Sequence, residues 1–228
     1  AGDEAARGVL TTTSSWSIAG GPSTFVGSGG KTGPAPFVAY ANGTAAHAQD
    51  FDDNFLAALT HASAVLVPAL LALGEETGAS GAEIIDAYLV GLECHAALGR
   101  GVNRSHYLKG WHATATVGCI GTAAACGRLL GLDAARMTHA MSLGVSMAAG
   151  LKGQFGSHAK PMQAGMAAQN AIIAASFARD GVIGRAEVLE NNYGFLNLFG
   201  GEAPPGWDFD CFPLGDSQDN GVHVIETV

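Results

Sequence analysis

Between about residue 36 and residue 191, apolar residues follow the spacing of α-helices in long alanine-rich segments. Evidence for strands is weak, because only STFV (residues 23–26) and VHVIETV (residues 222–228) are short candidates. The pattern therefore predicts an all-α domain. Its six expected helices cover residues 37–53, 62–76, 82–98, 114–130, 133–149 and 162–180.

The composition changes on both sides of this helical region. Residues 1–36 are rich in Gly, Ser, Thr and Pro, with GGPSTFVGSGGKTGPAP the most turn-dense stretch. Residues 192–228 carry aromatic residues and two adjacent prolines, but show no helical period. We therefore divide the chain into a Gly/Ser/Pro-rich N-terminal segment (1–36), a helical domain (37–191) and an irregular tail (192–228).

Polar and glycine residues at the predicted helix ends support these boundaries. Ser80 and Glu83 have the spacing of a capping box, and Asp133 is an expected N-cap. Gly99 and Gly131 follow apolar helical runs, where a left-handed residue is expected after the last turn.

The composition excludes several classes of protein. Apolar residues make up 48% of the 228 residues and charged residues 14%, which rules out a disordered acidic segment. The 33 glycines follow no three-residue period, which rules out collagen. The longest apolar run, over residues 62–73, is too short to span a bilayer and contains Pro68. Small residues on most faces of the helices predict close packing between them.

Charge and cysteine content indicate the expected partners and compartment. The net charge is −9 and Lys and Arg are scattered singly, so we expect no nucleic-acid partner, and an anionic substrate would need a local cationic pocket. The four cysteines form no C-x-x-C pair, which favours buried free thiols in a reducing compartment. Because AGDEAARGVL has no signal-peptide pattern, we expect a cytoplasmic protein.

The first candidate site is HAQDFDD followed by Asn54. On a helix, His47, Asp50 and Asn54 would share one face, with Asp53 close to Asp50. Two neighbouring carboxylates can raise the pKa of one of them towards neutrality. The alternative is a solvated acidic helix end. We expect no metal here, because no second His or Cys pair offers the usual ligand set.

Two histidines stand directly before predicted helices. His61 precedes the helix that begins near residue 62, where it either caps the helix or points into a pocket. His112 precedes a helix with Thr114 as candidate N-cap, and the positive end of the helix dipole keeps such an imidazole neutral. A neutral imidazole suits a general base or an electrophilic donor. Ordinary structural roles remain open for both.

The fourth candidate is GQFGSHAKPMQAG. Pro161 fits the first position of a helix, and Lys160 then lies beside free backbone N–H groups. This combination favours binding of a carboxylate or phosphate, with His158 as an additional donor. The alternative is a solvated loop lysine. GSGGKTG lacks the spacing of a phosphate loop, and His95 and His139 are interpreted as core histidines.

Long blocks of this sequence resemble the MmgE/PrpD family in order and spacing. These blocks are ANGTAAHAQDFDD, THASAVLVPALLALGEETGASGAEIIDAYLVGLE, GWHATATVG and GSHAKPMQAGMAAQNAIIAASFARDG, within residues 20–200. The family includes 2-methylcitrate dehydratase and related decarboxylases and epimerases. The resemblance implies a helical main domain, a homodimer, no metal or organic cofactor, and proton transfer beside a carboxylate of a small di- or tricarboxylate.

The resemblance also identifies site residues. Asp50 matches the first Asp of the family's D-F-D-D, and Asn54 stands where Thr is common. His61 matches the His of H-P-S, His112 the His of G-x-H-P-T, and Lys160 the Lys of K-P. Ala62 and Ala113 replace the two prolines that follow these histidines.

We assign expected roles to these residues by combining the resemblance with the physical arguments above. Lys160 would bind a substrate carboxylate, His112 or His61 would move the proton, and Asp50 would orient an imidazole. Asn54 and His158 would contact the substrate. The expected function is that of a cofactor-independent lyase similar to 2-methylcitrate dehydratase, with a decarboxylase or epimerase as alternatives.

The resemblance implies a longer architecture than this sequence. Family members carry a second, α+β domain that closes over the pocket, so we expect here a compact multi-helix domain that lacks this C-terminal lid. A separate chain could supply the lid. The rival interpretation is a lid-less, non-catalytic assembly protein.

Overall fold

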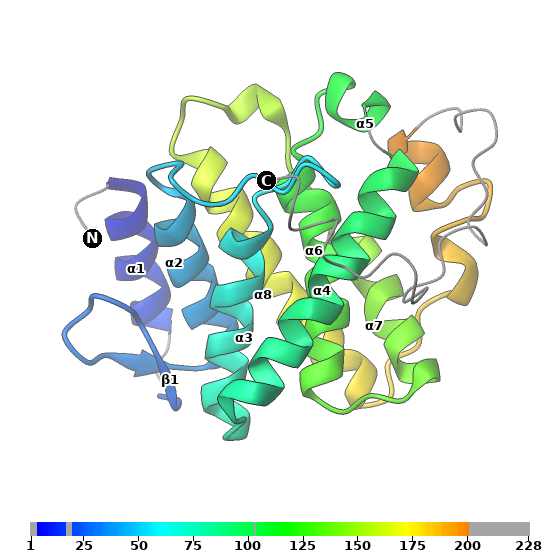
Figure 1. Ribbon diagram of the computed structural model, residues 1–228. Helices are drawn as coiled ribbons and strands as arrows, with labels where there is room; N and C mark the ends of the chain where they lie inside the picture. Colours follow the sequence, from blue (N-terminus) through cyan, green and yellow to red (C-terminus); the bar gives the residue numbers. More distant parts are fainter. Residues whose placement is uncertain (1–3, 17–19, 103, 201–228) are drawn as a thin grey trace.

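The computed structural model describes residues 4–16, 20–102 and 104–200, which form a bundle of α-helices with one two-stranded hairpin (Figure 1). The all-α prediction is confirmed. The elements are α1 (Glu4–Trp16), β1 (Ser23–Thr24), β2 (Thr32–Gly33), α2 (Ala35–His47), α3 (Ala62–Thr77), α4 (Gly81–Val102), α5 (Ser105–Leu108), α6 (Ala113–Leu129), α7 (Ala134–Met147), η1 (Lys152–Gln154), α8 (Ala159–Arg179), η2 (Ala186–Val188) and η3 (Leu196–Gly200).

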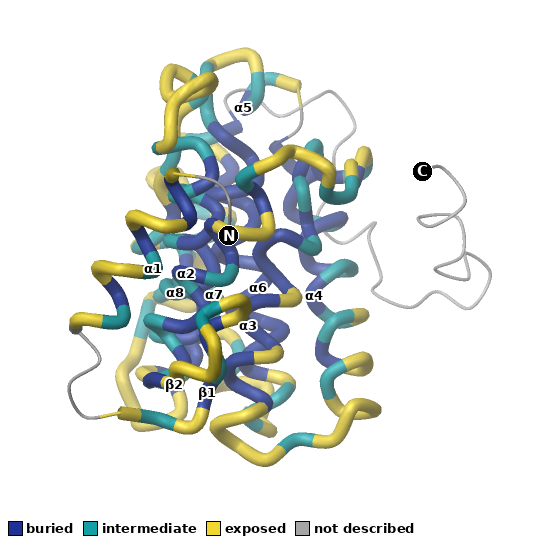
Figure 2. Tube along the Cα trace, turned by 90° about the vertical axis from the view of Figure 1, so that its left-hand side faces the viewer, coloured by how far each residue is buried: buried dark blue, intermediate teal, exposed yellow. Residues whose placement is uncertain are grey.

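Helices α6 and α8 form the centre of the bundle. Helix α8 packs against α2, α3, α6 and α7, and α6 packs in addition against α3, α4 and α7. Every residue of α6 from Ala113 to Gly127 is buried, which Figure 2 shows as a dark blue path through the molecule. A helix that is buried on all sides needs small side chains, and this explains the sequence ATATVGCIGTAAACG.

Glycines set the closest approaches between helices. Where α2 crosses α8, a Cβ added to Gly43 would lie 3.0 Å from the Cα of Gly165. Gly99 faces the backbone of Ala58, again without room for a Cβ. These contacts confirm the close packing that the small-residue composition predicts.

The predicted caps are largely confirmed. Asp133 accepts a hydrogen bond from the backbone N of Arg136 (2.9 Å), and Gly131 has a φ of 67° after α6. Ser80 and Glu83 form the capping box, with the Ser80 N–H donating to the Glu83 carboxylate at 2.7 Å. Gly99, however, lies inside α4, which continues to Val102. The prediction that Gly99 ends this helix was wrong, because its contact with the α2–α3 loop requires a glycine there.

The end of α2 also differs from the prediction. This helix ends at His47 instead of residue 53, so AQDFDD (residues 48–53) belongs to the loop that leads to α3. Asp50 has a φ of 56°, which a helix cannot contain, and Asp52 turns back to bind His47. The shared helix face of His47, Asp50 and Asn54 was therefore a wrong prediction, because polar side chains compete with the helix at this point.

The N-terminal segment contains helix α1, which its composition did not reveal. Hydroxyl groups in TTTSS bond back to the preceding turn, for example Thr11 to Arg7 O and Ser14 to Leu10 O. Packing on α2 supports this helix. Of the candidate strand STFV, only Ser23 and Thr24 pair, with Thr32 and Gly33, and GSGGKTG lies largely in the hairpin turn. VHVIETV lies outside the described residues.

The remaining sequence predictions concern buried residues and the tail. Cys94, Cys119 and Cys126 are free and buried, as predicted, while Cys211 lies outside the described residues. The tail is not wholly irregular, because Leu196–Gly200 forms a π-helical turn beside α4 and α5. In the part of the chain that the structure describes, no helix combines the length and hydrophobicity needed to cross a bilayer.

Candidate active site

The predicted site residues gather at one end of the bundle, where the α2–α3 loop crosses the first turns of α3, α6 and α8. We call this region, His47–His61 together with His112 and Lys160, the histidine end. It lies at the top of Figure 1. His47 ends α2, His61 and His112 are the N-cap residues of α3 and α6, and Lys160 lies in the first turn of α8.

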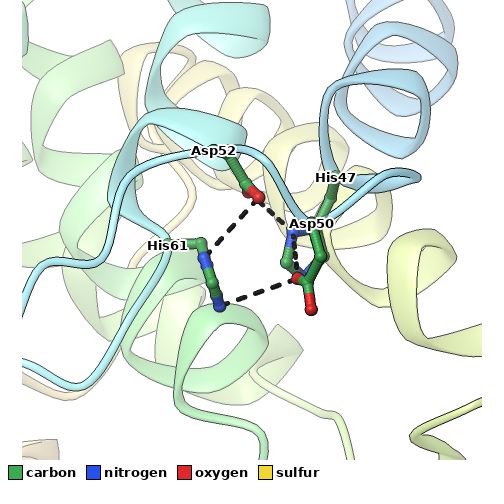
Figure 3. A group of neighbouring side chains, drawn as sticks. All are labelled: His47, Asp50, Asp52 and His61. Atoms are coloured by element: carbon green, nitrogen blue, oxygen red, sulfur yellow. Dashed lines mark hydrogen bonds and ion pairs between the residues drawn. The ribbon is translucent and has the colours of Figure 1, made fainter.

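Asp52 is shared by two histidines (Figure 3). The Nδ1 of His47 donates a hydrogen bond to Oδ2 of Asp52 at 2.7 Å, and the Nδ1 of His61 lies 3.6 Å from Oδ1. Burial raises the pKa of Asp52, but the hydrogen bond from His47 and the nearby imidazoles outweigh it, so this pKa lies below its usual value. Asp52 is therefore an ionised group that orients His47 and lies close to His61.

Asp50 pairs with Lys160. The Lys160 ammonium donates to Oδ1 of Asp50, and this contact holds the pKa of Asp50 below its usual value. The same oxygen lies 3.8 Å from His47 Nδ1 and 3.9 Å from His61 Nε2. Asp50 adopts its left-handed φ without glycine, a strained conformation that is more common at functional sites.

His112 is buried and keeps a neutral ring. Burial lowers the pKa of His112 to about 4, although a hydrogen bond with Gln163 acts in the opposite direction. Its Nδ1 lies 2.7 Å from Oε1 of Gln163. The ring stacks at 5.8 Å on His47 and meets the edge of Phe155 at 5.0 Å between centroids. The low pKa agrees with the neutral His112 expected from the sequence, but its main cause is burial and not the helix dipole.

Two hollows adjoin this cluster and share Lys160. The first, of about 160 Å³, has a mixed apolar and polar wall. The second, of about 280 Å³, includes His47, Asp50 and His158. The first hollow is lined by Asn54, Phe55, Leu56, Leu59, Thr60, His61, Tyr107, His112, Thr114, Phe155 and Lys160.

Most of the predicted site residues meet around the first hollow. Asn54, His61, His112 and Lys160 line it, and Asp50 contacts Lys160. His158 does not line it: this exposed side chain belongs to the second hollow, with Nε2 3.6 Å from Glu4.

Three local predictions need correction. Pro161 is the third residue of α8, not the first, because the helix begins at residue 159. Thr114 does not cap α6, since its hydroxyl oxygen accepts a hydrogen bond from the backbone N of His61 (3.0 Å). Asp53 does not form a carboxylate pair with Asp50: it accepts a hydrogen bond from the backbone N of Ser63 and so stabilises the start of α3.

Sequence reasoning missed Asp52, Gln163 and Phe155 as site residues. The spacing of Gln163, three residues after Lys160 on the same helix, was a usable signal. For Asp52 no signal was available, because its contact with His47 depends on the conformation of the loop. No signal was available for Phe155 either, because its contact with His112 depends on the conformation of the chain after the short helical turn η1.

The histidine end leaves several polar atoms without partners. Among the described residues, six buried side-chain nitrogen or oxygen atoms lack a hydrogen-bond partner, and five belong to this end. An unsatisfied buried polar atom costs about 1–3 kcal/mol. These five atoms are candidates to bind a polar ligand, although two of them, Asp52 Oδ1 and His61 Nδ1, face each other at 3.6 Å. They are His47 Nε2, Asp52 Oδ1, Thr60 Oγ1, His61 Nδ1 and His112 Nε2.

The Lys160 ammonium weighs against a metal ion at this cluster. His47, Asp50, Asp52 and His61 offer ligand atoms within 4.8 Å of one another and could in principle hold a metal ion. The Lys160 ammonium already occupies one oxygen of Asp50, and it would repel a divalent cation placed there. A carboxylate would instead find an ammonium and imidazole groups.

Comparison with known proteins identifies the class to which this bundle belongs. The sequence model of the MmgE/PrpD N-terminal domain matches residues 2–208. The chain therefore belongs to the MmgE/PrpD family, as the sequence blocks indicated.

The particular relatives are decarboxylases. The chain is 35% identical over 191 residues to cis-aconitate decarboxylase of Aspergillus terreus, covering 79% of this chain and 39% of that protein. It is 32% identical over 176 residues to the human enzyme of the same name, covering 75% of this chain and 36% of that protein. The mouse enzyme is 31% identical over 194 residues, covering 82% and 39%. The matched region thus spans less than two-fifths of these relatives.

Proposed function

We propose that this chain is the helical, substrate-holding part of a lyase that acts on a small polycarboxylate by proton transfer beside a carboxylate. The observation that carries the proposal is the first hollow, whose wall presents the Lys160 ammonium together with His61 and the neutral His112. We place decarboxylation of a cis-aconitate-like substrate before dehydration, because the curated relatives are cis-aconitate decarboxylases. The sequence alone had favoured dehydration slightly.

Each side chain has a role that its contacts support. Lys160 has two further ammonium hydrogens beyond its bond to Asp50, and these would bind a substrate carboxylate. His112 is neutral and suits the proton acceptor that dehydration or epimerisation requires, whereas decarboxylation releases no proton from the substrate. His61 lies between Asp50 and Asp52 and would return a proton. In dehydration that proton goes to the departing hydroxyl group, whereas in decarboxylation a proton must be supplied to the carbanion that loss of CO₂ leaves.

The charge of the site bears on its partners. A tricarboxylate would meet Lys160, but also the carboxylates of Asp50 and Asp52, so tight binding needs further positive charge. We propose that a second domain, on the same polypeptide or on a separate chain, supplies these groups.

We further propose a homodimer. Exposed apolar side chains at i and i+4 on two neighbouring helices support it, namely Val67 and Leu71 on α3 and Ile85 and Leu89 on α4. The same surface would serve the rival function, a non-catalytic assembly protein. Sedimentation together with thermal melting, with and without polycarboxylates, separates the two, because stabilisation by the ligand is expected only for the lyase.

The decisive variant is Lys160→Ala, compared with Lys31→Ala in the β1–β2 hairpin. We expect Lys160→Ala to weaken cis-aconitate binding at least tenfold by calorimetry, a loss of roughly 1.4 kcal/mol. Lys31→Ala removes the same charge away from the site and should leave affinity within about twofold. Mass spectrometry after incubation with cis-aconitate, 2-methylcitrate or iminodisuccinate distinguishes loss of CO₂, loss of water and epimerisation. Equal affinity of both variants would refute the role of Lys160.

A further inference from the structure

Gln163 holds the ring of His112 from the side away from its free nitrogen. The amide oxygen Oε1 lies 2.7 Å from Nδ1 of His112, and the amide nitrogen Nε2 donates to the carbonyl of Leu151 at 3.3 Å. The backbone N of His112 in turn donates to Gly150 O at 3.0 Å. The two partners of the Gln163 amide, the His112 ring and the Leu151 carbonyl, therefore belong to two backbone segments that are hydrogen-bonded to each other.

These contacts fix the direction of each hydrogen bond. The carbonyl of Leu151 only accepts, so the amide group that faces it must be the NH₂. A flipped amide would place two carbonyl oxygens 3.3 Å apart without a hydrogen between them. The oxygen of Gln163 consequently faces His112 and also only accepts. The proton of the neutral imidazole must then reside on Nδ1.

The opposite ring nitrogen is the chemically available one. Nε2 of His112 is buried and has no hydrogen-bond partner among the described residues. With the proton on Nδ1, Nε2 carries the lone pair. We propose that Gln163 is a positioning residue, whose amide oxygen holds the Nδ1–H form of His112 and leaves the lone pair on Nε2, where it would accept the substrate proton in dehydration or epimerisation. This inference rests on the proposed function for the identity of the proton donor, but not for the form of the ring.

A neutral partner has a specific consequence. His47 is paired with a carboxylate, Asp52, whereas His112 is paired with an amide that carries no charge. A carboxylate at residue 163 would favour the charged imidazolium. The amide orients the ring without favouring protonation, which suits a base.

The test observes His112 directly by long-range ¹H–¹⁵N NMR of the histidine rings in the full 228-residue chain. We expect the Nδ1–H form in the unmodified protein. In Gln163→Leu the acceptor is lost and the Nε2–H form should appear. In Gln163→Glu, which keeps an acceptor and nearly the same shape, His112 should titrate at least about one pH unit higher. Gln169→Leu, on the same helix but outside the contact between Gln163 and His112, is the matched control and should change neither result.

Kinetics separate positioning from simple structural support. If the chain turns over a polycarboxylate, Gln163→Leu should reduce kcat about 100-fold while KM changes less than about threefold. Gln163→Glu should move the pH profile upward. An Nε2–H ring in the unmodified protein, or an unchanged ring form in Gln163→Leu, would overturn the inference. Absence of binding of any polycarboxylate to the unmodified protein, with the NMR results as expected, would refute the proposed function alone.

Discussion

The middle of the bundle and its histidine end are built from the same helices but follow different packing rules. In the middle, α2, α4, α6 and α8 meet through glycine and alanine, and a single added Cβ would overlap a neighbour. At the histidine end, larger polar side chains surround hollows, and five buried polar atoms lack partners among the described residues. The difference shows that the middle fixes the positions of the helices, while the end keeps hydrogen-bonding capacity for a ligand.

Acid should affect both regions and give the largest change. Burial lowers the pKa of His95 in the middle, of His106 near η3 and of His112 at the histidine end to about 4. The unfolded chain binds these protons at a pKa of about 6.5, so between pH 6.5 and 4 it takes up more protons than the folded chain. The free energy of unfolding should therefore fall as the pH falls through this window, by about 1–2 kcal/mol per histidine at pH 5.

Urea unfolding measured between pH 7 and pH 4 tests this expectation. His95→Gln should remove roughly a third of the pH dependence, if the three histidines contribute equally. A free energy of unfolding that stays constant down to pH 5 would show that these imidazoles are not kept neutral by burial.

The second largest effect is expected from a substitution in the middle of the bundle. Gly165→Ala places a Cβ against the Thr44 hydroxyl and the backbone of Tyr40, so α2 and α8 must separate. We expect a loss of about 2–3 kcal/mol in the free energy of unfolding, measured with urea.

Gly8→Ala is the matched control, because Gly8 lies in α1 with no atom within 4 Å of an added Cβ. This change should instead stabilise the protein by up to about 1 kcal/mol, owing to the helix propensity of alanine. Similar behaviour of the two variants would contradict the distinction between close-packed and open helix positions.

The smallest effect is expected where the chain departs from the family pattern at the histidine end. Ala62 and Ala113 are the first residues of α3 and α6, where a backbone N–H has no partner within its helix. Ala62→Pro and Ala113→Pro should therefore be tolerated. We expect each to raise the free energy of unfolding by about 0.4–1 kcal/mol, which a slightly higher melting temperature would report. Ala115→Pro, two residues later, removes the N–H that donates to His112 O and should destabilise the protein strongly. A strong loss in the first two variants would contradict this assignment of the helix starts.

The same contrast explains what the sequence could predict. Helix periodicity and small residues depend on local spacing, so the all-α class and six helices were predicted to within a few residues at most ends. The end of α2 was wrong because Asp50 and Asp52 take part in contacts across the loop. Lys160, His61 and His112 were found because each stands beside a helix start or in a recognisable block. Asp52 required the loop conformation, and the amide direction of Gln163 required the carbonyl of Leu151.

The contact between Gly43 and Gly165, where α2 crosses α8, sets the spacing of the site residues on these two helices. Gly43 lies one turn before His47 on α2, and Gly165 lies little more than one turn after Lys160 on α8. His47 and Lys160, which flank Asp50, therefore each lie about one helical turn from the contact between Gly43 and Gly165. A change of a few tenths of an ångström in this helix contact alters the spacing between the Lys160 ammonium and the His47 imidazole. Variation of small residues deep in the bundle is thus a route by which relatives could tune the site without changing any side chain that lines it.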